Sequence, residues 1–270
     1  MKQLIVNADD FGFTEDVNTG IIEAHERGIL TAATLMGNGR AFDHAVKLAR
    51  EHPRLDVGCH LVLAGGESLS EPGRKLPATV GRMMAAVAAG GLHVRRELEA
   101  QIERILQAEV NPTHLDTHKH THLYPPVLAV VAELSERYGI KWVRRPFDLP
   151  MTGTGRGPWK VQAVSKALKG VRRRFHTVLE RHGCRWTDHF AGFQMTGRYR
   201  AQELIALLEH LPDGVTEFMC HPGHYGEALR AARTRLKESR QRELEALTTP
   251  EVKAVLADRQ IRLTCYRELA

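Results

Sequence analysis

Apolar and polar positions along the first 145 residues alternate between two spacings. Short segments rich in apolar or β-branched residues, typical of buried strands, lie at 3–8, 30–37, 55–63, 112–118 and 140–145. Between them, apolar residues recur every three or four positions, as in amphipathic helices, at 15–28, 41–52, 94–109 and 125–139. This regular alternation of strand and helix predicts a parallel α/β sheet, either open or closed into a barrel.

The same alternation continues in the last third of the chain. It predicts a helix at 201–211, a strand at 215–223, a charged helix at about 227–247 and a last strand near 260–266. Two stretches interrupt the alternation: residues 64–93 carry Gly and Pro followed by small residues, and residues 147–186 are Gly-rich and then basic. We therefore expect one domain over 1–270 with insertions at about 64–93 and 147–186, a length that is ordinary for an α/β barrel.

The composition suits a globular protein of the cytoplasm. Hydrophobic residues make up 43% of the 270, enough for a sizeable core. Apolar runs fall short of the ~20 residues that a membrane span requires, and the apolar start of the chain is too short for a signal peptide. The four cysteines form no CxxC pair, which favours a reducing compartment over a disulfide framework.

Four polar clusters follow predicted strands. They are Asn7-Ala8-Asp9-Asp10, His60, the segment HLDTHKHTH at 114–122, and CHPGH at 220–224. In parallel α/β folds the carboxyl ends of the strands open on one side, where functional side chains gather. We therefore expect these clusters to meet at one mouth.

Each cluster also has an ordinary structural interpretation. One of Asp9 and Asp10 could cap the next helix, since neighbours on a strand point to opposite faces and only a turn brings both to one site. His60, alone in an apolar strand, could be a core histidine bonded to the backbone. His221 could be a loop histidine, or a general acid at the mouth.

The histidine-rich segment is the strongest indication of chemistry. If it continues as a strand, period-2 alternation places His114, Asp116, His118, His120 and His122 on one face. A helix would instead align residues 114, 118 and 122, and a surface cluster that binds metal only adventitiously is a third possibility. One carboxylate with two imidazoles is a common open site for a catalytic divalent metal, which neighbouring acids and histidines then orient.

The motifs NADDFG, GCHLVL, THLDTHKHTH and CHPG, in this order, resemble the YdjC-type carbohydrate deacetylases. That family includes the chito-oligosaccharide deacetylases and the hopanoid-biosynthesis deacetylases of the HpnK type. The resemblance is strong over residues 1–145 and looser from 187 onward. It implies a distorted (β/α) barrel that removes N-acetyl groups from amino sugars with a divalent metal.

The resemblance also implies roles for individual residues. Asp10, His60 and His118 would hold the metal. Asp9 would be the base that activates water, and His221 the acid that protonates the leaving amine. The surrounding shell, or the contacts to substrate, would be formed by Asp116, His120 and His122.

The cofactor is expected to be one divalent ion. Two imidazoles and one carboxylate fit zinc, cobalt or nickel better than magnesium on ligand softness, whereas the family is often described with magnesium. We therefore expect zinc or magnesium first, with cobalt, nickel and manganese as alternatives.

A basic segment dominates the second insertion. Residues 144–185 hold eleven Lys or Arg against two acids, although the whole chain has a net charge of only +6. Within it, residues 159–182 have the pattern of a basic amphipathic helix. Such a helix either docks on the barrel with a solvated basic face or contacts an anionic membrane surface, as a lipid-linked amino sugar would require.

Three further expectations concern partners. The stretch TDHFAGFQMTGRY resembles the hopanoid-type members, so an N-acetylglucosaminyl glycolipid stands beside chito-oligosaccharides as the candidate substrate. Nucleic acid is not expected, because aromatics are 6% and the basic run lacks interleaved stacking residues. A homodimer is the default oligomer.

Two other functions remain as alternatives to deacetylation. A metallo-phosphoesterase would also use metal-activated water, although such sites usually require two metals and more carboxylates than these strand ends offer. A non-catalytic sugar- or metal-binding regulator would have no need for Asp9 as base and His221 as acid.

Overall fold

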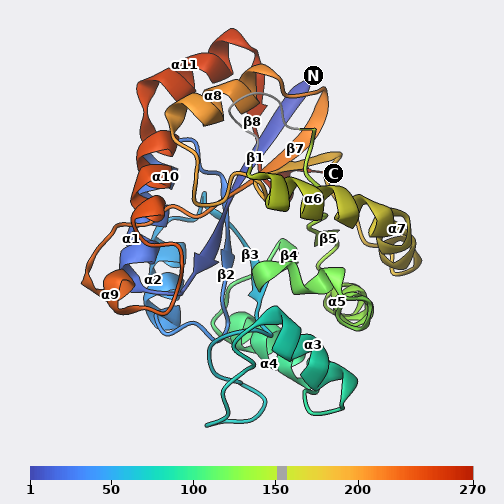
Figure 1. Cartoon of the computed structure of the whole chain (residues 1–270). Helices are drawn as coiled ribbons and strands as arrows, with labels where there is room; N and C mark the ends of the chain where they lie inside the picture. Colours follow the sequence, from blue (N-terminus) through green and yellow to red (C-terminus); the bar gives the residue numbers. More distant parts are fainter. Residues whose placement is uncertain (151–156, 270) are drawn as a thin grey trace.

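A sheet of parallel strands forms the centre of the molecule (Figure 1). The computed structural model describes residues 1–150 and 157–269. The strands in these residues are β1 (Lys2–Phe11), β2 (Ala32–Leu35), β3 (Asp56–Leu61), β4 (His114–Thr117), β5 (Trp142–Val143), β6 (His189–Ala191), β7 (Gly214–Cys220) and β8 (Ile261–Leu263). They follow the order β5-β4-β3-β2-β1-β7-β6, and β8 pairs with the beginning of β1.

Helices surround this sheet. Those of the first half are α1 (Glu15–Arg27), α2 (Phe42–Glu51), α3 (Val80–Ala88), α4 (Val94–Gln107) and α5 (Pro125–Tyr138). Those of the second half are α6 (Trp159–Leu168), α7 (Arg172–Arg181), α8 (Ala201–Glu209), α9 (Glu227–Ala231), α10 (Glu238–Thr248) and α11 (Pro250–Asp258). Short 3-10 segments are η1 (His118–Leu123), η3 (Lys169–Val171) and η4 (Tyr266–Glu268).

The sheet curls into a barrel that closes loosely. Between its two end strands there are isolated parallel bridges rather than a continuous ladder: Trp142 of β5 pairs with Arg185, before β6, and Asp148, after β5, pairs with Phe190 of β6. Strand β5 itself has only two residues. The expected distorted (β/α) barrel is thus confirmed, and the distortion lies between β5 and β6.

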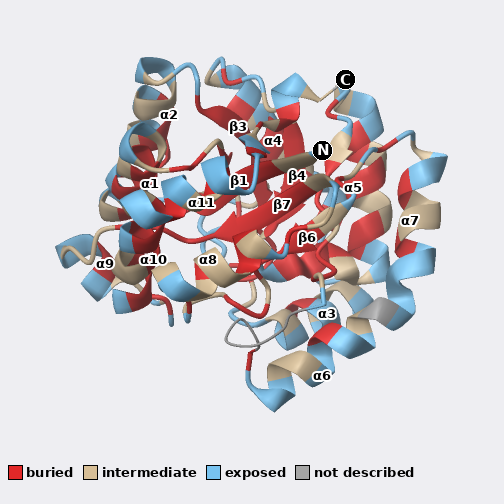
Figure 2. Cartoon of the chain, turned by 90° about the horizontal axis from the view of Figure 1, so that it is seen from above, coloured by how far each residue is buried: buried red, intermediate tan, exposed pale blue. Residues whose placement is uncertain are grey.

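Strand β1 is the central strand of the sheet. It pairs with β7 over seven residues, from Lys2–Gly214 to Ala8–Cys220, and with β2 and β8 on its other side. Leu4, Ile5 and Val6 are completely buried, because helices cover the outer face and side chains fill the interior. Figure 2 shows this contrast between a buried sheet and helices whose outward faces are exposed.

Several elements differ from the prediction. The charged helix at 227–247 is in fact two helices, α9 and α10, because the backbone becomes extended at Ala232. The pattern also missed α3, β6 and α11. Helix α3 is hidden in a Gly- and Ala-rich stretch, where its N-cap Thr79 accepts a hydrogen bond from Arg82 N.

The first insertion is tied firmly to the barrel. Buried Glu97 on α4 accepts hydrogen bonds from Leu69 N and from Ser70 N and Oγ, at 2.9–3.1 Å. The neighbouring Gln101 side chain bonds both the N–H and the C=O of Val62. The segment 62–70 therefore forms a fixed rim beside the strand ends.

The second insertion is not the single basic helix that the sequence predicts. Residues 159–182 form α6 and α7, separated by the 3-10 turn η3 that contains Gly170; glycine is a poor helix former. The Gly-rich part of this insertion, residues 151–156, lies outside the described residues. Among the described helices, none has the length and apolar character to cross a membrane.

Candidate metal centre and active site

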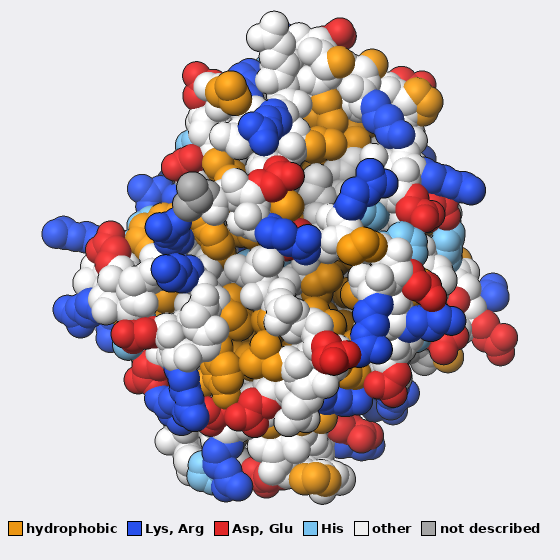
Figure 3. Space-filling view, turned by 180° about the vertical axis from the view of Figure 1, so that it is seen from behind, with side chains coloured by type: hydrophobic (Ala, Val, Ile, Leu, Met, Phe, Trp, Pro, Cys, Tyr) orange, Lys and Arg blue, Asp and Glu red, His pale blue; other side chains and the backbone are white. Residues whose placement is uncertain are grey.

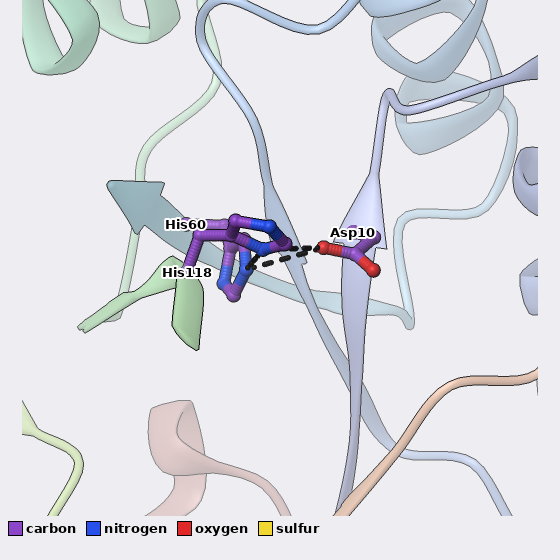
Figure 4. A group of neighbouring side chains, drawn as sticks. All are labelled: Asp10, His60 and His118. Atoms are coloured by element: carbon purple, nitrogen blue, oxygen red, sulfur yellow. Dashed lines mark hydrogen bonds and ion pairs between the residues drawn. The ribbon is translucent and has the colours of Figure 1, made fainter. Parts of the chain in front are cut away.

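Three side chains from three strand ends point at one another (Figure 4). Asp10 belongs to the end of β1, His60 to β3, and His118 is the first residue after β4. Asp10 Oδ1 lies 3.0 Å from His118 Nδ1 and 3.3 Å from His60 Nε2. The two ring nitrogens are 3.2 Å apart. Three potential ligand atoms thus form a nearly equilateral triangle.

The backbone at Asp10 explains how two adjacent aspartates reach one site. Asp10 has φ +69°, a left-handed conformation that is uncommon for a residue other than glycine, and the β1–β2 register shifts between Ala8 and Phe11. Asn18 Oδ1 holds the turn by accepting a 2.7 Å hydrogen bond from Gly12 N. Backbone strain of this kind is commonly found at functional sites.

Asp116 determines which nitrogen of His60 faces the centre. His60 Nδ1 lies 2.7 Å from Asp116 Oδ1, so Nε2 is directed toward Asp10. Burial alone would lower the pKa of His60, but the carboxylates of Asp116 and Asp9 raise it to about 10. A carboxylate that receives the outer N–H of a ligating histidine is a recurring arrangement in metal sites.

The triangle fits a divalent cation. Asp10 Oδ1 is buried and, among the described residues, forms no regular hydrogen bond in addition to its close contacts with the two ring nitrogens. With metal–ligand bonds of about 2.0–2.2 Å, neighbouring ligand atoms lie roughly 3.0–3.5 Å apart, which matches the observed spacing. Burial would raise the pKa of Asp10, but Arg240 and His118 hold it well below its ordinary value, so the carboxylate is charged.

A second group of possible ligands shares His60 with the first. Asp9, His60 and Asp116 place ligand atoms within 4.8 Å of one another. Here, however, a guanidinium already supplies the positive charge. Arg144 contacts both oxygens of Asp9 at 2.7 and 2.9 Å, Asp116 Oδ2 at 2.5 Å and Glu217 Oε1 at 2.7 Å. The residues present therefore fit one cation, which Asp10, His60 and His118 could hold.

Arg144 is the functional side chain that the sequence analysis placed wrongly. It was counted in the basic surplus of 144–185, yet it is 1% exposed and lies inside the barrel. A signal was available, because Arg144 is one of the last two residues of the predicted strand 140–145 and thus lies near a predicted strand end. Arg145, its neighbour, is half-buried.

Asp9 and His221 lie beside the triangle. Burial raises the pKa of Asp9 to about 6, although Arg144 opposes this shift. His221 Nε2 is 3.9 Å from Asp9 Oδ2, and its buried Nδ1 has no hydrogen-bond partner in the part of the chain that the structure describes. Burial holds the pKa of His221 well below its ordinary value. The Asp10 carboxylate raises this pKa, whereas the Arg240 guanidinium lowers it further. His221 is therefore neutral.

The predicted common face of the histidine-rich segment is wrong beyond Thr117. Strand β4 ends there, and the chain turns into η1 with Lys119 and His120 in left-handed conformations. His118 consequently reaches the centre through a turn. Pleat alternation holds only for His114 and Asp116.

The other histidines of the segment lie away from the triangle. His114 stacks on Tyr266 with ring centroids 3.9 Å apart. His122 contacts Thr117 Oγ1 and Arg144 O through its two ring nitrogens, at 2.5 and 3.0 Å, so it supports the backbone near Arg144. His120 packs against Phe190 and Phe193.

Helix α10 contributes a second group of residues that sequence reasoning missed. Arg240 is buried and its Nη2 contacts Asp10 Oδ2. Glu243, one turn later, accepts hydrogen bonds from His221 N at 2.6 Å and Gly197 N at 2.7 Å. Both belong to the stretch that the sequence predicts as a charged helix at about 227–247. Their spacing of three residues, which puts them on one helix face, was the available signal.

Comparisons with known proteins show the family of the chain. The family described as YdjC-like protein matches residues 3–258. A carbohydrate deacetylase of Brevibacillus brevis is 36% identical over 99% of both chains. A chitooligosaccharide deacetylase of Salmonella enteritidis is 31% identical, also over 99% of both chains. A solved structure from Enterococcus faecalis, provisionally named a cellobiose-phosphate cleavage protein, is 26% identical with a TM-score of 0.75, and the match covers 100% of this chain and 99% of that one.

Proposed function

The chain belongs to the YdjC-like family, and from that premise we propose that it is a metal-dependent hydrolase that removes the N-acetyl group from an acetamido sugar. The deacetylases among its relatives support the reaction. The observation that carries the proposal is the triangle of Asp10, His60 and His118 with Asp9 and His221 beside it.

Asp10, His60 and His118 would hold the cation. When bound there, a divalent metal polarises the amide carbonyl and makes water more acidic. One carboxylate oxygen and two ring nitrogens favour zinc, cobalt or nickel, and magnesium and manganese stay open as alternatives.

Asp9 is proposed as the base. Arg144 binds both of its oxygens and so fixes the plane of the carboxylate, while burial keeps the pKa of Asp9 at about 6, close enough to neutrality for it to accept a proton. The attacking water would give its proton to Asp9 as its oxygen forms the new bond to the acetyl carbon.

His221 is proposed to complete the proton path. Because it is neutral before the reaction, it can receive the proton from Asp9, whose Oδ2 lies 3.9 Å from Nε2. It would then protonate the sugar nitrogen as the C–N bond breaks, which leaves acetate and a free amine. Glu243 holds the backbone of His221 in place for this step.

The acceptor is proposed to be a chito-oligosaccharide or a lipid-linked N-acetylglucosaminyl sugar of hopanoid type. The lipid-linked form draws support from α6 and the residues after it. Trp159, Val164 and Val171 are 73%, 49% and 44% exposed, and exposed Lys and Arg side chains lie between and beyond them, at 160, 166 and 172–174. Aromatic, aliphatic and cationic side chains together suit the surface of an anionic membrane.

Charge elsewhere on the surface is more evenly mixed. On the face opposite to that of Figure 1, Lys and Arg are interspersed with Asp and Glu (Figure 3). We therefore propose peripheral membrane contact through 159–182 alone, on a cytoplasmic protein, and keep a homodimer as the default oligomer.

The phosphoesterase alternative is weakened by Arg144. Two-metal phosphoesterases need a second cation about 3.5–4 Å from the first, and the second carboxylate group here is already neutralised by the Arg144 guanidinium. A non-catalytic regulator would need neither a base nor an acid, so it does not explain why Asp9 and His221 lie side by side.

Acetate release tests the proposal. Metal-free protein would be supplied with zinc, cobalt or magnesium and offered N-acetylglucosamine oligomers or an N-acetylglucosaminyl lipid. Metal-dependent release that is lost in Asp9→Asn and kept in the exposed control Asp43→Asn is the expected result. Absence of release from every acceptor with every metal would contradict the proposal.

A further inference from the structure

The two carboxylate oxygens of Asp10 have separate surroundings. Oδ1 faces the ring nitrogens of His60 and His118. Oδ2 contacts Arg240 Nη2 on α10. Asp10 is 3% exposed and Arg240 is 1% exposed, so this ion pair is shielded from water. Charge-assisted hydrogen bonds of this kind are short and strongly directional.

Arg240 is held in place from several sides. Its carbonyl oxygen accepts a 3.2 Å hydrogen bond from Gly223 N, its Nε donates to Leu236 O at 3.4 Å, and its guanidinium lies 5.8 Å from the centroid of the Phe13 ring. Glu243 anchors the next turn of α10 to the loop after β7. The guanidinium therefore approaches Asp10 from a fixed position.

Stability alone does not account for this placement. Within the residues that the structure describes, Arg240 Nη1 is buried and has no hydrogen-bond partner, and an unpaired buried donor is unfavourable, the more so when it is charged. Within residues 1–150 and 157–269, Asp10 is the carboxylate that forms an ion pair with Arg240. The buried position of Arg240 is explained if its guanidinium serves to hold the Asp10 carboxylate.

We propose that Arg240 is a positioning residue for the metal centre: it occupies Oδ2 so that Asp10 presents a cation with Oδ1 only. The inference rests on the proposed metal centre. One-oxygen binding by Asp10, with one nitrogen from each histidine, gives three protein ligands. Such a set leaves coordination positions open for water and for a carbonyl oxygen of the substrate.

Metal binding measured without turnover tests the role of Arg240. Metal-free protein is titrated with Zn²⁺ in competition with a chromophoric chelator, and Co²⁺ is followed through its visible absorption. Removal of an outer partner of a ligand commonly weakens metal affinity 10- to 100-fold. Arg240→Met is therefore expected to bind Zn²⁺ at least about tenfold more weakly and to change the Co²⁺ spectrum, because Asp10 is freed to rotate and bind through both oxygens.

Two further variants make the test specific. Arg240→Lys keeps a positive donor near Oδ2 and is expected to recover most of the affinity. Arg242→Met is the control, because Arg242 lies on the same helix and forms no ion pair within the described residues. It is expected to bind both ions as the unaltered protein does. If Arg240→Met does not fold, Arg240→Gln, which lacks the charge, is judged by the same tenfold criterion.

The outcomes separate this inference from the proposed function. If the unaltered protein binds the ions and a folded Arg240→Met binds Zn²⁺ within twofold with the same Co²⁺ spectrum, the role of Arg240 is overturned and the metal centre stands. If the unaltered protein binds neither ion, the metal centre itself is wrong, and this inference falls with it.

Discussion

Asp116 Oδ1 lies 2.7 Å from His60 Nδ1, and this contact directs the other nitrogen of His60 toward Asp10. Replacement of Asp116 by Asn would leave an amide that can present the wrong atom to the ring. We expect Asp116→Asn to weaken Zn²⁺ binding by about 10- to 100-fold. Isothermal titration of metal-free protein measures this, with exposed Asp43→Asn as control. Unchanged affinity in Asp116→Asn would show that the contact does not orient His60.

A second prediction separates two histidines of the same motif. His118 points into the triangle, whereas His114 stacks on Tyr266. His118→Gln is expected to lose metal binding and acetate release by more than about 100-fold, since a direct ligand matters at least as much as an outer one. His114→Gln should bind one equivalent of metal normally. Equal losses in both variants would contradict the geometry.

The third prediction concerns acid stability. Burial lowers the pKa of His114 to about 4 in the folded protein, whereas an unfolded histidine titrates near 6.5. Between these values the unfolded chain binds more protons, so stability is full above about pH 6.5 and falls as the pH decreases toward 4. Each such histidine contributes a slope of up to about 1.4 kcal/mol per pH unit.

Urea unfolding of the metal-free protein at pH 7 and pH 5.5 measures this slope. The unaltered protein should lose stability between the two values, and His114→Gln should lose less, by about 1 kcal/mol. His93→Gln, at an exposed position, should behave like the unaltered protein. The explanation fails if His114→Gln and the unaltered protein show the same pH dependence.

The fourth prediction concerns the buried cation. Arg144 is paired with Asp9, Asp116 and Glu217, so Arg144→Met would remove the guanidinium that these three buried carboxyl groups share and leave His60 as the nearby cation of Asp116. We expect a loss of about 3–5 kcal/mol in the free energy of unfolding, as for other broken buried ion pairs. Half-buried Arg145→Met is the neighbouring control, and chemical denaturation compares the two. A similar, small loss of unfolding free energy in both variants would show that Arg144 does not stabilise the three carboxylates as proposed.

The fifth prediction concerns the α6–α7 surface. Sedimentation with vesicles of anionic phospholipid should retain the protein at low salt, and Trp159→Ser combined with neutral replacements of Arg172 and Arg173 should release it, because both apolar and charge contacts are lost. Vesicles of neutral lipid are the control. No retention on anionic vesicles would remove the support for a lipid-linked acceptor.

The sequence predicts the barrel well because its strands and helices obey local patterns. The apolar run 3–8 and the 3.6-residue spacing of 94–109 correspond to β1 and α4 with small shifts of their ends. The pattern fails where no local rule applies. Gly170 divides a basic stretch that otherwise continues the helical spacing, and β6 has only three residues, too few for a periodic signal.

The site residues also divide into those that the sequence indicates and those that depend on tertiary structure. Histidines and aspartates at strand ends are unusual enough to notice, but the choice of Asp10, His60 and His118 as one set came from the resemblance to the YdjC-type family. Arg144 and Arg240 had only weak sequence signals, because an arginine in a basic segment or a charged helix is ordinarily solvated. Their burial depends on the closure of the barrel near β5 and on the docking of α10, which are tertiary events. The left-handed turn that brings His118 inward is equally invisible to alternation.

Titration of metal-free protein with zinc, read out as acetate released from an N-acetylglucosamine oligomer, tests the central claim most directly. We predict that activity rises linearly and saturates at one equivalent of metal per chain, because Arg144 fills the place of a second cation. Saturation at two equivalents, or acetate release that is unaffected by metal, would contradict a single centre at Asp10, His60 and His118.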